Sequence, residues 1–108
     1  MITFKEPLVR AYQIAPQVFA ALAKADGIWI SLGAAELVVT SLNDGSHSTG
    51  SLHYKGLAAD LRTHNLPSPQ ARVEAWRRLK AALGSAYDVL HEHVGTPNEH
   101  VHLEYDPQ

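Results

Sequence analysis

Hydrophobic residues recur at helical spacing near the start of the chain. From Val18 to Leu32 they follow the i, i+3, i+4, i+7 pattern, which predicts one helix over about 16–32 with a proline at its first position. Gly33 then suits the position just past a helix end. Gly27 lies inside this pattern and costs a helix about 1 kcal/mol, so two shorter helices broken at Gly27 are the alternative.

A second helix is expected from Ser68, whose hydroxyl can cap it, with a proline at its first position and a glycine at its end. The stripe that we expect this helix to bury consists of Val73, Trp76, Leu79 and Leu83. Trp76 and Trp29 both fall on helical stripes, so they are predicted to belong to the core rather than to a carbohydrate-binding platform.

Short segments rich in β-branched and apolar residues predict four strands, at 36–41, 57–62, 87–93 and 100–105. The last two are joined by turn residues and should form a hairpin. Residues 1–15 show no clear period and are expected to be an extended lead-in. This order of elements predicts an α+β fold, a small antiparallel sheet with helices packed on one face, in a single domain over 1–108.

Composition excludes several classes of function. The formal net charge is −2, so the chain has no basic surplus for binding nucleic acid. No stretch reaches the roughly 20 apolar residues of a membrane span, and the N-terminal residues lack the apolar core of a secretory signal. We therefore expect a protein that is cytoplasmic as synthesised. Cysteine is absent, so any metal site must use His, Asp or Glu.

Three residues in two separate segments suggest such a site. A catalytic zinc needs three protein ligands, usually His and carboxylate, and an open position. His53 in the polar loop, Asp60 on the following strand and His102 in the hairpin would supply them. Taken singly, each is more simply a loop, capping or surface residue. Gly56 and Ala58 are small residues that suit a place where the backbone passes close to a crowded site. Together with them, the three candidate ligands favour metal binding.

The segment from Ser51 to Asp60 matches the pattern S-x-H-x-x-G-x-A-x-D at all five fixed positions. It resembles the signature of the zinc D-Ala-D-Ala carboxypeptidase family, which includes phage L-alanyl-D-glutamate endolysins and D,D-dipeptidases and shares its fold with the Hedgehog signalling domain. The H-x-H signature of that family is matched by His100 and His102. The resemblance covers about residues 36–106 and is greatest to the small phage-type members.

The resemblance implies that His53, Asp60 and His102 bind Zn²⁺ and that His100 is a catalytic group near the developing oxyanion. It implies a zinc metallopeptidase that hydrolyses peptidoglycan stem peptides, either as a D-Ala-D-Ala carboxypeptidase or as an L-Ala-D-Glu-type endopeptidase. It further suggests an enzyme that a separate phage lysis protein releases to the cell wall, or one carried by the phage particle. Neither nucleic acid nor a membrane is expected as a partner.

Two residues compete for the role of general base. Glu99 lies three residues before His102, as in dipeptidase-type members of the family, and Glu92 ends the preceding strand, as in phage-type members. Residues three apart on a strand point to opposite faces. A hairpin centred on Pro97 would place Glu92 directly opposite His102, so we favour Glu92. A slip of one residue in the register would favour Glu99 instead.

The other histidines have simpler interpretations. His91 and His93 alternate with Glu92 and should face away from it, as surface or packing residues. His47 and His64 are expected to be loop residues.

The chain departs from the family pattern at one position. Many members carry an arginine after the strand corresponding to 36–41, where it holds the substrate carboxylate or the oxyanion, and no arginine stands there in this chain. The candidates to replace it are Arg10, His47, Lys55 and Arg62. The missing arginine gives some weight to an alternative function, a Hedgehog-like zinc-binding interaction module without hydrolytic activity. A weaker alternative is a structural domain that binds no metal.

Overall fold

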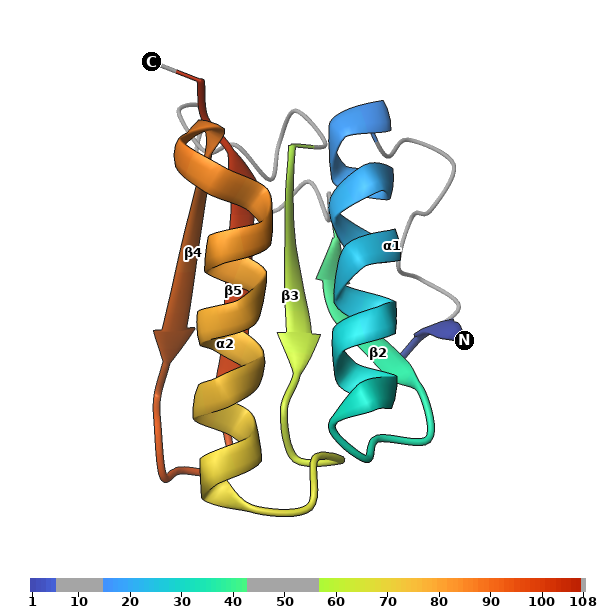
Figure 1. The fold of residues 1–108 in the computed structure, drawn as a ribbon, viewed down its shortest axis with the longest axis vertical. Helices are drawn as coiled ribbons and strands as arrows, with labels where there is room; N and C mark the ends of the chain where they lie inside the picture. The colour runs from blue at the N-terminus through green and yellow to red at the C-terminus, as the bar shows by residue number, and fades with distance from the viewer. Residues whose placement is uncertain (6–14, 43–56, 108) are drawn as a thin grey trace.

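The computed structural model describes residues 1–5, 15–42 and 57–107, in which two helices pack on one face of a five-stranded sheet (Figure 1). The strands lie in the order β1-β2-β3-β5-β4, and every pair of neighbours is antiparallel except β1 and β2. This arrangement confirms the predicted α+β class. The bounds are β1 (Ile2–Phe4), α1 (Pro16–Ser31), β2 (Leu37–Leu42), β3 (Ala58–Arg62), α2 (Pro69–Leu83), the 3₁₀ turn η3 (Gly84–Ala86), β4 (Tyr87–Glu92) and β5 (His100–Tyr105).

Helix α1 is continuous through Gly27, which confirms one helix rather than two. Its Pro16 occupies the first turn, where the missing N–H has no partner to lose. Gly33 follows the helix with φ of 107°, a conformation that disfavours other residues. The buried residues of the helix are Val18, Ala21, Leu22, Ala25 and Trp29, as the periodicity predicts. The indole N–H of Trp29 donates to the carbonyl oxygen of Arg62 (2.9 Å) and so ties α1 to the end of β3.

Helix α2 begins as predicted, because the Ser68 hydroxyl accepts a hydrogen bond from the N–H of Ala71 (3.0 Å). The predicted buried stripe is wrong at Val73, whose side chain is 42 % exposed. Ala75 and Leu79 are the fully buried residues of this helix. Trp76 is half-buried against the core, and its indole N–H donates to the Val89 carbonyl oxygen (2.9 Å).

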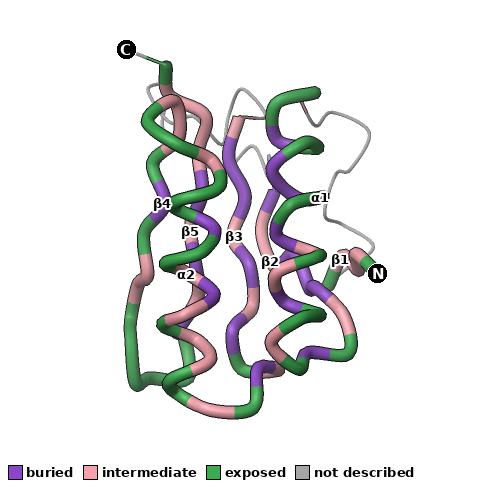
Figure 2. Tube along the Cα trace, in the orientation of Figure 1, coloured by how far each residue is buried: buried purple, intermediate pink, exposed green. Residues whose placement is uncertain are grey.

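The two faces of the sheet differ sharply in chemistry. Apart from His91 of β4, the residues of β3, β4 and β5 that point toward the helices are apolar and join or pack against the core, and buried positions recur along these strands (Figure 2). On β3, β4 and β5 they are Ala59, Leu61, Val89, Val101 and Leu103. Side chains alternate along a strand, so the intervening polar residues of the same strands share the opposite face. That face carries most of the residues singled out in the sequence.

Strand β1 was not expected from the sequence, which suggested only an extended lead-in over residues 1–15. Ile2–Phe4 pairs in parallel with the start of β2, with Ile2 opposite Leu37. On its other side, β2 pairs with β3 through an irregular register, in which Thr40 is the extra residue between Val39 and Ser41. This bulge lies beside Asp60, whose carbonyl oxygen accepts a weak hydrogen bond from the Thr40 hydroxyl (3.4 Å).

The hairpin of β4 and β5 forms as predicted, but its register differs. Glu92 pairs with His100, and Leu90 rather than Glu92 lies opposite His102. The predicted centre at Pro97 is therefore wrong, because the turn closes one residue earlier through a hydrogen bond from the N–H of Thr96 to the carbonyl oxygen of His93 (3.1 Å). The register moves by two residues, an even number, so Glu92 remains on the same face as His102.

Within the described parts of the chain, no helix combines the length and apolar character needed to cross a membrane.

Candidate metal centre

Two of the three predicted zinc ligands lie side by side on adjacent strands. Asp60 of β3 is directly opposite His102 of β5 in the antiparallel register. The Oδ1 atom of Asp60 lies 2.7 Å from the Nδ1 atom of His102. Both side chains belong to the face of the sheet that the helices leave uncovered, and both are largely but not fully shielded from solvent. The short β3 and the regular β5 thus bring residues 42 positions apart in sequence into direct contact.

A second carboxylate holds the other nitrogen of the same imidazole. Glu104 follows His102 by two residues on β5 and places its Oε1 atom 2.6 Å from Nε2. Burial alone would lower the pKa of His102, but the hydrogen bonds and charges of Asp60 and Glu104 outweigh it and raise the pKa to about 9. The ring is therefore protonated at neutral pH, and it donates one N–H to each of the two carboxylates.

The donor set fits zinc in its chemistry. Zinc binds imidazole nitrogen and carboxylate oxygen, and His102 and Asp60 offer one of each. A carboxylate on the remaining nitrogen of a ligating histidine is the usual outer partner in such sites, where it fixes the ring and its tautomer, and Glu104 occupies that position. The third predicted ligand, His53, lies outside the described residues, as do Ser51 and Gly56.

The predicted catalytic groups lie on the same face. His100 precedes His102 by two residues, and its Nε2 atom is 3.0 Å from Glu92 Oε1 and 3.9 Å from Asp60 Oδ1. Its Nδ1 atom lies 2.7 Å from the carbonyl oxygen of Asn98. Both ring nitrogens thus face oxygen acceptors, and both hydrogen bonds form together when the ring carries two protons. Glu92, His100, Asp60 and His102 form a continuous row of polar contacts across β4, β5 and β3.

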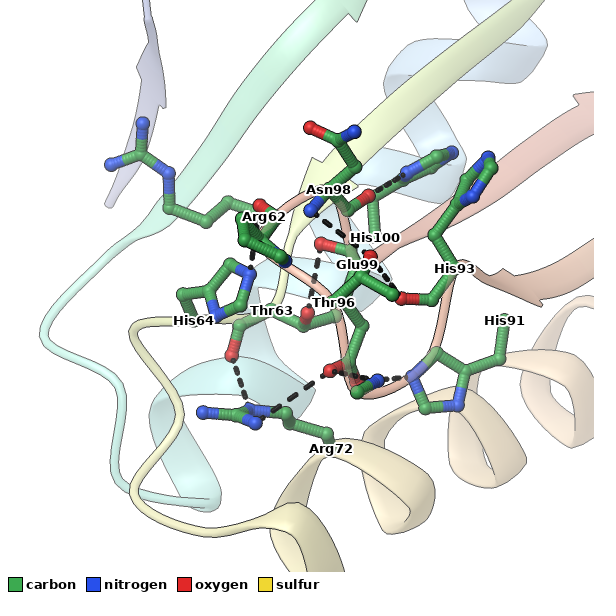
Figure 3. A network of polar contacts seen from close by, with 12 residues as sticks. Arg62, Thr63, His64, Arg72, His91, His93, Thr96, Asn98, Glu99 and His100 are labelled. Atoms are coloured by element: carbon green, nitrogen blue, oxygen red, sulfur yellow. Dashed lines mark hydrogen bonds and ion pairs between the residues drawn. The ribbon is translucent and has the colours of Figure 1, made fainter.

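Glu99, the competing candidate for the base, lies elsewhere. Its side chain is only 2 % exposed and is directed toward the helices, beneath the turn that joins β4 and β5 (Figure 3). There its carboxylate contacts His91 Nε2 (2.7 Å), the N–H of Gly95 (3.2 Å) and the guanidinium of Arg72 (3.6 Å). These partners hold the carboxylate away from Asp60 and His102, so within this conformation Glu99 cannot act as their base.

The neighbouring histidines divide between the two faces. His91 lies toward α2, with its ring 6.1 Å from the ring of Trp76, as the alternation predicts. His93 is exposed, as predicted, and its ring centre lies 5.7 Å from that of His100. The backbone of His93 has a positive φ of 53°, at the point where the strand ends and the turn begins.

A group of three carboxylates that includes Glu104 was not predicted from the sequence. Oxygen atoms of Asp88, Glu104 and Asp106 lie within 4.8 Å of one another, so this group could also hold a metal ion. Partial desolvation and the adjacent carboxylates of Asp106 and Glu104 raise the pKa of Asp88. Ligands that are all oxygen suit hard cations better than zinc. The feature that indicates this group is the pairing of β4 with β5, which places the like charges of Asp88 and Glu104 directly opposite each other.

No protein-family model matches this chain, and no curated protein matches it either. The assignment of a function therefore depends on the motif and on the geometry of the described residues.

Proposed function

We propose that this protein is a zinc-dependent peptidase that hydrolyses peptidoglycan stem peptides. The observation that carries the proposal is the contact between Asp60 and His102, which brings together one residue from each of the two motifs. Those motifs match the zinc D-Ala-D-Ala carboxypeptidase family at every fixed position. The α+β architecture, with both helices on one face of a mostly antiparallel sheet, is compatible with the fold of that family.

In this proposal Asp60 and His102 bind zinc together with His53. Glu104 receives the N–H of His102 Nε2 and so directs Nδ1 toward the metal. Bound zinc supplies a Lewis acid that polarises a water molecule and the scissile carbonyl. Asp60 would then serve as a ligand instead of accepting the hydrogen bond that His102 Nδ1 donates to it in the described conformation.

Glu92 is the proposed general base. Its carboxylate lies on the ligand face and is oriented by His100 through the contact at 3.0 Å. It accepts a proton from the attacking water and passes that proton to the leaving amine. Protonation removes the negative charge that holds His100 Nε2, which frees this N–H to donate to the carbonyl oxygen as that oxygen gains charge.

The direct test is incubation of the zinc-loaded protein with peptidoglycan fragments, followed by mass spectrometry of the products. We expect loss of a terminal D-alanine or cleavage between L-alanine and D-glutamate, which would also identify the bond. Zinc binding without any cleavage would contradict the peptidase and favour a zinc-binding interaction module. In the cell, a wall-degrading role requires access to the cell wall, which we expect a separate phage lysis protein to provide.

A further inference from the structure

Leu90 is an apolar residue on the polar face of the sheet, the face that the helices leave uncovered. The registers of β3, β5 and β4 place the residues of this face in three cross-strand rows. The rows are Ala58, Glu104 and Asp88; Asp60, His102 and Leu90; and Arg62, His100 and Glu92. Ala58 is fully buried, so Leu90, which is 46 % exposed, is the one exposed apolar side chain in these rows.

Leu90 does not contribute to the hydrophobic core. It lies on β4, at the edge of the sheet (Figure 1), and it belongs neither to the core nor to the partly buried residues that pack against the core. Its neighbour Val89 points to the helices and is buried there, as alternation along the strand requires. The side chain of Leu90 is therefore open to a molecule that binds on the polar face.

The position of Leu90 relates it to the candidate metal centre. Leu90 lies directly opposite His102, and His102 lies directly opposite Asp60. Neighbouring strands are about 4.8 Å apart, so Leu90 is about 5 Å from His102 and about 10 Å from Asp60 across the sheet. One residue of an extended peptide spans about 3.4 Å. A peptide carbonyl held between Asp60 and His102 can therefore bring the side chain of its own residue into contact with the branched end of Leu90.

The position of the proposed base indicates which side of the scissile bond faces Leu90. Glu92 passes its proton to the leaving amine in the proposed mechanism, and it lies with His100 in the next row of this face. The leaving amine is therefore directed toward Glu92, and the residue whose carbonyl is attacked lies over the row of Leu90. In both bonds expected for this peptidase, D-Ala-D-Ala and L-Ala-D-Glu, that residue is an alanine, so its side chain is a methyl group.

We propose that Leu90 is a specificity-determining residue, which contacts the methyl group of the alanine on the acyl side of the scissile bond. The contact favours alanine over glycine, because the methyl group then buries apolar surface against Leu90. An acidic side chain at the same place is disfavoured, since the carboxylates of Asp88 and Glu92 flank Leu90 on this face. The inference rests on the proposed peptidase function and names the side chain that this function selects.

The test compares peptides that differ by this one methyl group. The carboxypeptidase pair is N-acetyl-L-Lys-D-Ala-D-Ala and the same peptide with glycine in place of the first D-alanine. The endopeptidase pair is N-acetyl-L-Ala-D-Glu and the same dipeptide with glycine in place of L-alanine. For the pair that it cleaves, the zinc-loaded wild type should show a kcat/KM about tenfold higher with alanine, the low end of the discrimination that one methylene provides.

Leu90→Ala should reduce this ratio to about twofold, whereas Leu90→Met keeps an apolar side chain and should keep a ratio of about tenfold. Both values of kcat/KM come from one preparation, so the ratio does not depend on the fraction of the variant that is folded. The matched control is Ile30→Ala on α1, which removes an isomeric side chain of similar exposure (42 %) and should leave the ratio unchanged.

A second readout needs no turnover. In NMR spectra of zinc-loaded Glu92→Gln labelled at its leucine methyl groups, the resonances of Leu90 should shift on addition of the alanine peptide, and less with the glycine peptide. Unshifted Leu90 resonances would overturn the contact. An unchanged ratio in Leu90→Ala, or a wild type without preference for alanine, would overturn the role of Leu90 and leave the peptidase standing. A wild type that cleaves neither pair would overturn the peptidase and this inference together.

Discussion

Glu92 and His100 face each other directly across the hairpin, with Oε1 of the glutamate 3.0 Å from Nε2 of the histidine. Glu92 is thereby fixed on the face that also carries Asp60 and His102, although its pair with His100 lies two residue pairs along the hairpin from His102. The contact fixes the two proposed catalytic groups next to each other. It also couples the charge of the Glu92 carboxylate to the proton on His100 Nε2.

Glu92→Gln should leave zinc binding and the fold intact, because glutamine is nearly isosteric and Glu92 is not a proposed ligand. It cannot accept the proton, so turnover of a peptidoglycan fragment should fall about 10²–10⁴-fold, the usual contribution of general-base catalysis. Glu74→Gln, the same change on the exposed part of α2, is the matched control and should retain wild-type turnover. Full activity in Glu92→Gln would exclude Glu92 as the base.

Asp60→Asn tests the proposed ligand on β3. Zinc affinity should fall more than about 100-fold, because losing even an outer partner of a ligand typically costs 10–100-fold. Competition with a chelator of known affinity gives the dissociation constant. The control is Asp26→Asn on α1, where the carboxylate pairs with the chain's amino terminus (2.7 Å) and no ligand is proposed. Equal zinc affinity in the two variants would remove Asp60 from the site.

Glu104→Gln tests the orientation of His102. The neutral amide of the glutamine holds the N–H of His102 Nε2 less strongly than the charged carboxylate does. Zinc should therefore bind about tenfold more weakly, with the same stoichiometry. The same titration provides the measurement. A complete loss of zinc would instead make Glu104 a direct ligand, in keeping with the adjacent group of Asp88 and Asp106.

Glu99→Gln should reduce the free energy of unfolding and leave the turnover of the folded protein unchanged. The side chain is buried with His91 and Arg72, and weakening charged hydrogen bonds of this kind costs about 1–3 kcal/mol. Urea unfolding with turnover measured on the folded fraction separates the two effects. If the folded Glu99→Gln variant lost turnover as Glu92→Gln is expected to, Glu99 would be the base.

The same residue makes stability depend on acid pH. Burial would raise the pKa of Glu99, but the hydrogen bonds from His91 and Gly95 and the charge of Arg72 reverse the effect and lower it below 4.5. A lowered pKa in the folded state adds stability that is present above pH 4.5 and is lost as the pH falls through the folded-state pKa. Glu99→Gln should therefore lose less stability than the wild type between pH 5 and pH 3. Parallel acid dependence in both proteins would contradict this account.

Local patterns in the sequence were sufficient for the helices and for four of the strands. The cap at Ser68 and the apolar stripe of α1 depend on neighbouring residues alone. Strand β1 could not be predicted in the same way, since Ile2–Phe4 is too short for a period and is held by β2 more than thirty residues away. Val73 was misplaced because it follows the helical spacing of the stripe, although its side chain is 42 % exposed in the structure.

The candidate site shows the same division. Alternation alone places His100 and His102 on one face of β5. That Asp60 shares this face follows from the pairing of β3 with β5, which sets Asp60 opposite His102. The register of the hairpin depends on the turn, where His93 adopts a positive φ that no hydrophobic pattern indicates. The burial of Glu99 depends on Arg72 from α2, a contact that spans 27 residues of sequence and was therefore invisible to local reasoning.

X-ray absorption spectroscopy of the zinc-loaded protein tests the central claim most directly, because it reports the ligands of the metal without requiring a substrate. We predict one zinc per chain with nitrogen and oxygen neighbours at about 2.0–2.2 Å and the scattering of two imidazole rings, one of which is lost in His102→Ala. A chain that binds no zinc would contradict the proposed centre. So would a zinc surrounded by oxygen alone, as expected at Asp88, Glu104 and Asp106.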